Sequence, residues 1–132
     1  MSNPNEIENL NERLAQGVDY FNREYYFEAH DEFEELWMDA REQTGRNLFH
    51  GLVNIATGFY HYRMGNLKGM QSQIGKGLEK LARVPDEYMG VDVANLTAEV
   101  RNYIKCETGE NGFREPLPRI EFDERKTPGS IC

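Results

Sequence analysis

Cysteine is scarce in this sequence, and long apolar runs and basic clusters are missing altogether. The two cysteines, Cys106 and Cys132, lie far apart, and neither belongs to a CxxC pair. Their placement argues against a disulfide framework, a zinc ribbon and a dithiol redox site. No apolar run reaches the length that crosses a bilayer, and the N-terminal stretch MSNPNEIENLNE lacks the basic and apolar regions of a secretory signal. We therefore expect a cytoplasmic protein.

The charge balance is acidic, with 23 aspartates and glutamates against 15 lysines and arginines, a net charge of -8. Because no lysine or arginine cluster interrupts this excess, a nucleic acid backbone or an anionic membrane would be repelled rather than neutralised. We expect neither nucleic acid nor membrane among the partners of this chain.

Helical periodicity dominates the sequence as far as about residue 106. Apolar residues recur at helical spacing in five segments, and no convincing alternating strand pattern appears. The second segment runs from about Glu24 to Arg41 and the third from roughly Arg46 to Met64, with the break between them at Gly45. The pattern predicts an all-α fold, a five-helix bundle of two antiparallel helical hairpins plus a capping helix, as a single domain over residues 1–106.

Residues 107–132 differ in composition, because their prolines and glycines exclude a long helix. These are Pro116, Pro118, Pro128, Gly109, Gly112 and Gly129. We expect an extended tail that packs on the helical domain or frays from it. Leu117, Ile120 and Phe122 are the apolar residues that can hold its middle in place.

One histidine stands out in the stretch YFEAHDEFEELW, residues 26–37. At 100° per residue, the large apolar side chains share one face of this helix, and most acids share the opposite, solvated face. His30 lies at the edge of the apolar face, between Tyr26 and Trp37, with Glu34 one turn away. A carboxylate in that position can accept the imidazole N–H and fix its tautomer.

The third predicted helix carries a polar strip opposite its apolar arc. The strip consists of His50, Asn54, Thr57 and His61. Gly51 and Gly58 flank it, and since glycine inside a helix costs roughly 1 kcal/mol relative to alanine, they indicate close contact with a neighbouring helix. We take the second helix as that neighbour and expect a buried polar pocket. Its predicted members are His30, Glu34, Asn54 and His61, with Trp37 as a wall.

The stretch YFEAHDEFEELW and the later stretch HGLVNIATGFYHYRMGNLKG, residues 50–69, resemble the signature of an uncharacterised family catalogued as domain of unknown function 309. The likeness runs from about Phe21 to Leu81. The residues that carry it are Tyr26, Glu28, Ala29, His30, Glu34, Trp37, Gly51, Leu52, His61, Gly65 and Asn66. The resemblance implies a small all-helical protein and no particular reaction. The sequence departs from the family pattern at His50 and Asn54, where glutamine is frequent, so the resemblance gives His50 no special role.

Three interpretations of the polar residues remain open. The first is a hydrogen-bond network that fixes the helix register. The second is a metal-dependent, hydrolase-like enzyme in which His30, Glu34 and His61 hold a divalent ion, zinc or iron, with a bound water as nucleophile.

The third interpretation is a binding or assembly module that uses surplus aromatic side chains. The aromatic residues concerned are Tyr25, Tyr26, Phe27, Phe59, Tyr60 and Tyr62. Their ligand would be a second copy of the chain, a peptide or a small molecule. The sequence contains no HExxH motif, no P-loop and no nucleotide-binding glycine run. We therefore favour a binding or assembly module over an enzyme.

Overall fold

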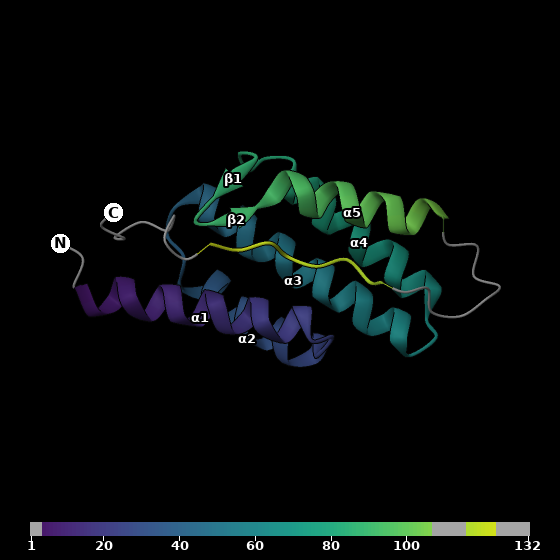
Figure 1. The fold of residues 1–132 in the computed structure, drawn as a ribbon, viewed down its shortest axis with the longest axis horizontal. Coiled ribbons are helices and arrows are strands. Elements are labelled where there is room, and N and C mark those ends of the chain that lie inside the picture. The colour runs from purple at the N-terminus through teal and green to yellow at the C-terminus, as the bar shows by residue number, and fades with distance from the viewer. Residues whose placement is uncertain (1–3, 107–115, 124–132) are drawn as a thin grey trace.

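Helices that run alternately in opposite directions build the molecule (Figure 1). The computed structural model describes residues 4–106 and 116–123, and within them there are five helices. They are α1 (Pro4–Asn22), α2 (Tyr26–Asp39), α3 (Gln43–Arg63), α4 (Leu67–Leu81) and α5 (Val93–Cys106). The predicted five-helix bundle is confirmed. Helix α3 lies between α2 and α4 and packs on both.

The core is organised around α3, which is buried along most of its length. The ring of Phe59 on α3 contacts Phe21 of α1, Tyr26 of α2 and Tyr103 of α5, with ring centroids between 5.6 and 6.2 Å apart. Burying a large apolar side chain contributes about 1.5–3 kcal/mol. Phe59 therefore joins four helices. These contacts fix the orientation of α3 between α2 and α4.

The break between α2 and α3 lies earlier than the predicted position at Gly45. Helix α2 ends at Asp39, Ala40 has an extended backbone (φ -70°, ψ 135°), and Gly45 is buried within the first turns of α3. The guanidinium of Arg46 donates to the carbonyl oxygens of Trp37 and Ala40, at 3.3 and 3.0 Å. Since the last carbonyls of a helix lack partners within it, Arg46 stabilises the end of α2.

The turn from α3 to α4 is tight and positions the start of α4 against the end of α3. Gly65 adopts a left-handed conformation (φ +82°), which glycine reaches without steric cost. The side chain of Asn66 then accepts a hydrogen bond from the backbone N–H of Gly69 at 2.9 Å, which caps α4.

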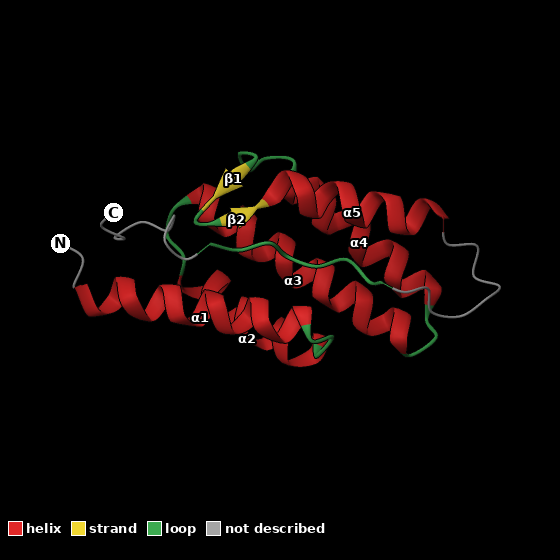
Figure 2. Ribbon diagram, in the orientation of Figure 1, coloured by secondary structure: helices red, strands yellow, loops and turns green. Residues whose placement is uncertain are grey.

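Two short strands follow α4, although the sequence shows no alternating pattern there. Strand β1 (Glu87–Tyr88) pairs antiparallel with β2 (Val91–Asp92), with Glu87 opposite Asp92 and Tyr88 opposite Val91 (Figure 2). Met89 and Gly90 form the turn, both at positive φ. Two residues per strand are too few to produce a period-2 signal, so this feature was missed by the sequence analysis.

The middle of the predicted tail crosses the helical bundle as an extended segment. Leu117 and Ile120 are buried, and Phe122 packs against the core and forms an isolated bridge with Val91. Asn22 at the end of α1 exchanges hydrogen bonds with the backbone of Ile120, at 2.8 and 2.9 Å. The other parts of the tail, residues 107–115 and 124–132, lie outside the described residues. Among the described helices, none has both the length and the apolar character to traverse a membrane.

Candidate functional site

The glycines of the α3 polar strip contact α4, not α2 as predicted. A Cβ added at Gly51 would lie 2.8 Å from Leu81 Cδ2 and 3.3 Å from the Gly77 carbonyl oxygen. One added at Gly58 would lie 2.7 Å from Ile74 Cγ1. The inference that a neighbouring helix approaches closely is correct. The choice of α2 as that neighbour is wrong, because the glycine edge of α3 faces the helix that follows it.

His30 lies on the edge of α2 beside α3, and its side chain is about one quarter exposed (27%). Its Nε2 is 3.6 Å from Glu34 Oε2, the one-turn pair expected from the sequence. Its Nδ1 lies closer, 3.1 Å, to Oδ1 of Asp31. The imidazole therefore has a carboxylate at each ring nitrogen, and both belong to its own helix.

Trp37 lies near the C-terminal end of α2, farther along the helix than His30, and faces α3. Its ring stacks on the imidazole of His50, with centroids 4.0 Å apart and planes inclined by 17°. The guanidinium of Arg46 lies over the same indole, 5.6 Å from the centroid. Burial, followed by the positive charges of Lys80 and Arg46, lowers the pKa of His50 below its ordinary value of 6.5. Lys80 belongs to α4, so this end of the strip is bordered by all three helices.

Asn54 and His61 are directed toward α4. Asn54 is buried, 7% exposed, and its Nδ2 donates to Gln73 Oε1 at 2.9 Å, while its Oδ1 has no hydrogen-bond partner among the described residues. The ring of His61 lies beside Gly69, since a Cβ added at Gly69 would be 2.9 Å from His61 Cγ. Neither residue is shown in contact with His30 or Glu34.

The closed pocket expected from the sequence is therefore not assembled. Within residues 4–106 and 116–123, no three His, Cys, Asp or Glu side chains form a group that could hold a metal ion, and this includes His30, Glu34 and His61. The predicted pocket required the whole polar strip of α3 to face α2. In the structure His50 contacts α2 and Asn54 contacts α4, so the strip separates two helices instead of closing against one.

The predicted residues instead lie along one face of the molecule, which we call the α2–α3–α4 face. Helix α2 contributes Phe27, His30, Glu34 and Trp37 to it, and α3 contributes His50, Asn54, Tyr60 and His61. Sequence reasoning missed the residues of α4 on this face, Gln73, Lys76 and Lys80. Gln73 contacts Asn54 and Lys80 lies near His50, and Lys76 falls between them at helical spacing. The helical spacing of Gln73, Lys76 and Lys80 was the feature of the sequence that could have identified them.

The structure also decides which aromatic residues are surplus to the core. Tyr26, Phe59 and Tyr62 are buried, whereas Tyr25, Phe27 and Tyr60 are 50%, 53% and 37% exposed. The rings of Phe27 and Tyr60 lie 5.7 Å apart, with Phe27 6.2 Å from His30 and Tyr60 6.3 Å from His61. Both predicted histidines thus flank an exposed aromatic pair at one end of the α2–α3–α4 face.

Comparison with known proteins finds similarity to one family over part of the chain, and neither match names an activity. A curated protein of Aquifex aeolicus (strain VF5), named only "Uncharacterized protein", is 21% identical to this chain over 112 residues. The match covers 85% of this chain and 32% of the relative, so the chain spans about a third of the length of the curated relative it matches. The family described as "Domain of unknown function (DUF309)" matches residues 14–73. The match extends from α1 into α4 and agrees with the resemblance of the two sequence stretches to this family.

Proposed function

We propose that the chain is an assembly module whose α2–α3–α4 face pairs with the same face of a second copy. The observation that carries this proposal is the exposed pair of Phe27 and Tyr60. Met64, one turn beyond Tyr60 at the end of α3, is 68% exposed and extends the apolar area. Large apolar side chains gathered on one part of a surface are typical of protein contacts.

Charge distribution supports a second copy as the partner. Helix α2 carries Glu34 and Asp31 along this face and has no lysine or arginine. Helix α4 carries Lys76 and Lys80 on the other side of α3. The face therefore has an acidic border and a basic border, with the aromatic pair at one end.

A two-fold axis parallel to α3 would make these borders complementary. Such an axis places α2 of one copy opposite α4 of the other, and does so twice, since every contact in a two-fold interface occurs in both directions. It also brings the two aromatic pairs together at the same end. Exposed ion pairs contribute little energy, so aromatic burial would supply most of the affinity and the charges would set the orientation.

Sedimentation velocity of the wild-type chain over a range of concentrations tests the proposal. We expect a monomer–dimer equilibrium that the double substitution Phe27→Ser, Tyr60→Ser shifts to monomer, since well-packed aromatic residues in interfaces can contribute about 2 kcal/mol or more each. Tyr25→Ser is the matched control. Tyr25 is also an exposed aromatic residue (50%), but its ring contacts Tyr20 of α1 and it is not part of the α2–α3–α4 face.

Two results would contradict the proposal. One is a wild-type chain that stays monomeric at the highest concentration. The other is a dimer that the Phe27 and Tyr60 substitutions leave unchanged, which would place the contact elsewhere. Circular dichroism of each variant checks that the helices are retained, and the exposure of both aromatic residues makes their loss compatible with folding.

A further inference from the structure

A second candidate site lies on another part of the molecule, between the end of α4 and helix α5. It is a cavity of about 460 Å³, within the range of small-molecule sites. Its apolar wall is formed by Leu81, Val84 and Val93, all buried. None of its lining residues belongs to the α2–α3–α4 face.

The cavity exists because α5 presents small side chains to it. Ala94, Thr97, Ala98 and Arg101 follow the spacing i, i+3, i+4, i+7 and so share one side of α5. The two alanines on this side leave the space next to α4 unfilled. The rim is fixed by the backbone, since the N–H of Ala94 donates to the carbonyl oxygen of Asp86 at 3.0 Å.

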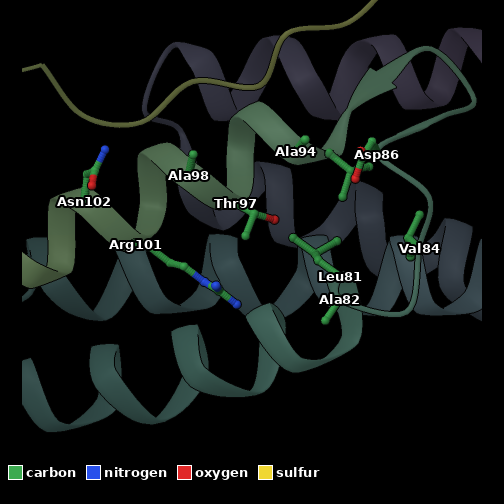
Figure 3. Close-up of a pocket in the computed structure, with 10 residues that line it drawn as sticks. Leu81, Ala82, Val84, Asp86, Ala94, Thr97, Ala98, Arg101 and Asn102 are labelled. Carbon is green, nitrogen blue, oxygen red and sulfur yellow. The ribbon is translucent and has the colours of Figure 1, made fainter.

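Arg101 is exposed and has no charged partner among the described residues. Within the described parts of the chain it has no hydrogen bond or ion pair, whereas Arg13, Arg46 and Arg83 each contact an oxygen. Figure 3 shows its side chain extending from α5 toward α4 at one end of the cavity, with Thr97 between it and Asp86. An arginine without a partner at the edge of an apolar cavity is suited to an anion.

The two charged ends of the cavity define the orientation of a ligand. Ala94, next to Asp86, and Arg101 are seven residues apart on α5, roughly 10 Å along the helix axis. An anionic group placed at Arg101 would be kept from the other end by the carboxylate of Asp86. One guanidinium neutralises a single negative charge, which matches a carboxylate better than a doubly charged phosphate.

We infer that this cavity binds a small monocarboxylate whose hydrocarbon body rests on Leu81, Val84 and Val93 while its carboxylate pairs with Arg101. The acidic net charge of the chain opposes anions only at long range, because salt screens such interactions beyond about 8–10 Å.

Titration of the full chain with hexanoate, followed by amide chemical shifts in two-dimensional NMR, tests this site. Saturable shifts are expected for the amides of Thr97, Arg101 and Val84, with hexanol, the uncharged molecule of the same chain length, binding at least about tenfold more weakly. Arg101→Gln should weaken hexanoate binding about tenfold. Arg23→Gln is the matched control, since Arg23 is an exposed arginine in the turn between α1 and α2, does not line the cavity and should leave the titration unchanged.

A second variant tests the cavity independently of the charge. Ala98→Leu places three additional carbons in the space between α5 and α4 and should abolish the hexanoate shifts while the rest of the spectrum is retained. The inference is overturned if hexanoate produces no saturable shifts, if hexanol binds equally well, or if Arg101→Gln leaves binding unchanged. Sedimentation reports on the α2–α3–α4 face separately, so either proposal can fail alone.

Discussion

Burial and nearby positive charge oppose the protonation of His50. Burial and the charges of Lys80 and Arg46 lower its pKa from 6.5. When the folded pKa is the lower one, the unfolded chain binds more protons below pH 6.5, so the free energy of unfolding falls as the pH decreases through that region. Replacing His50 with glutamine, which is neutral, should remove this part of the pH dependence. Urea unfolding of both proteins between pH 7.5 and about pH 5 measures it, and parallel curves would contradict the assignment.

The pKa of Tyr88 is raised in the folded protein, whereas that of His50 is lowered. Burial, then the hydrogen bond that Tyr88 donates to Glu42, then the charge of Glu42, raise the pKa of Tyr88 to about 12. The folded state therefore retains the phenolic proton longer than the unfolded state does, and stability is lost as the pH rises from about 10 toward 12. Tyr88→Phe should lose about 1 kcal/mol at neutral pH and show a shallower decline in alkali. The difference between the two unfolding curves isolates Tyr88 from the other tyrosines.

At the scale of helices, the close contact of α3 with α4 depends on the absence of side chains. Gly58→Ala should destabilise the fold by about 1–3 kcal/mol, because the added Cβ would lie 2.7 Å from Ile74 and 3.3 Å from the carbonyl oxygen of Met70. Gly75→Ala is the control. It also lies inside a helix but has no atom within 4 Å of the added Cβ, so it should stabilise by up to about 1 kcal/mol. Thermal unfolding of both variants measures the difference, and equal effects would contradict the predicted packing.

The helices and their apolar faces could be predicted from the sequence, because periodicity and end signals are local. The relative rotation of two helices could not. Gly51 and Gly58 correctly indicated a close neighbour, but α2 and α4 are both adjacent to α3 in the chain, and spacing alone does not choose between them. For the same reason, the sequence analysis predicted Asn54 and His61 in one pocket with His30. The structure assigns them to the contact with α4.

Local sequence patterns also failed to predict strands of two residues and a helix end that depends on residues farther along the chain. The pair of two-residue strands is held partly by Phe122, which bridges to Val91 from the tail. The end of α2 is set by Arg46, several residues farther along the chain, rather than by Gly45. Neither contact leaves a period in the sequence.

At the scale of the whole molecule, the proposed two-fold contact makes a prediction about paired charges. Glu34 and Lys76 lie on opposite borders of the α2–α3–α4 face, and each would meet the other in the second copy. Glu34→Lys or Lys76→Glu alone should weaken dimerisation about tenfold, because each creates two repulsive pairs.

The double variant, with both charges reversed, should recover most of the wild-type affinity and its dependence on salt. Sedimentation at low and high ionic strength measures all four proteins. Additive loss in the double variant would show that the two residues do not meet across the interface, and the two-fold axis parallel to α3 would then be wrong.

The stacking of Trp37 on His50 has an optical consequence. Trp37 is the single tryptophan of the chain, and a protonated imidazole in contact with an excited indole withdraws an electron from it and quenches its emission. The intrinsic fluorescence of the unlabelled protein should therefore dim as acid charges His50, and should brighten if α2 separates from α3. The fluorescence of Trp37 therefore reports on the packing of α2 against α3.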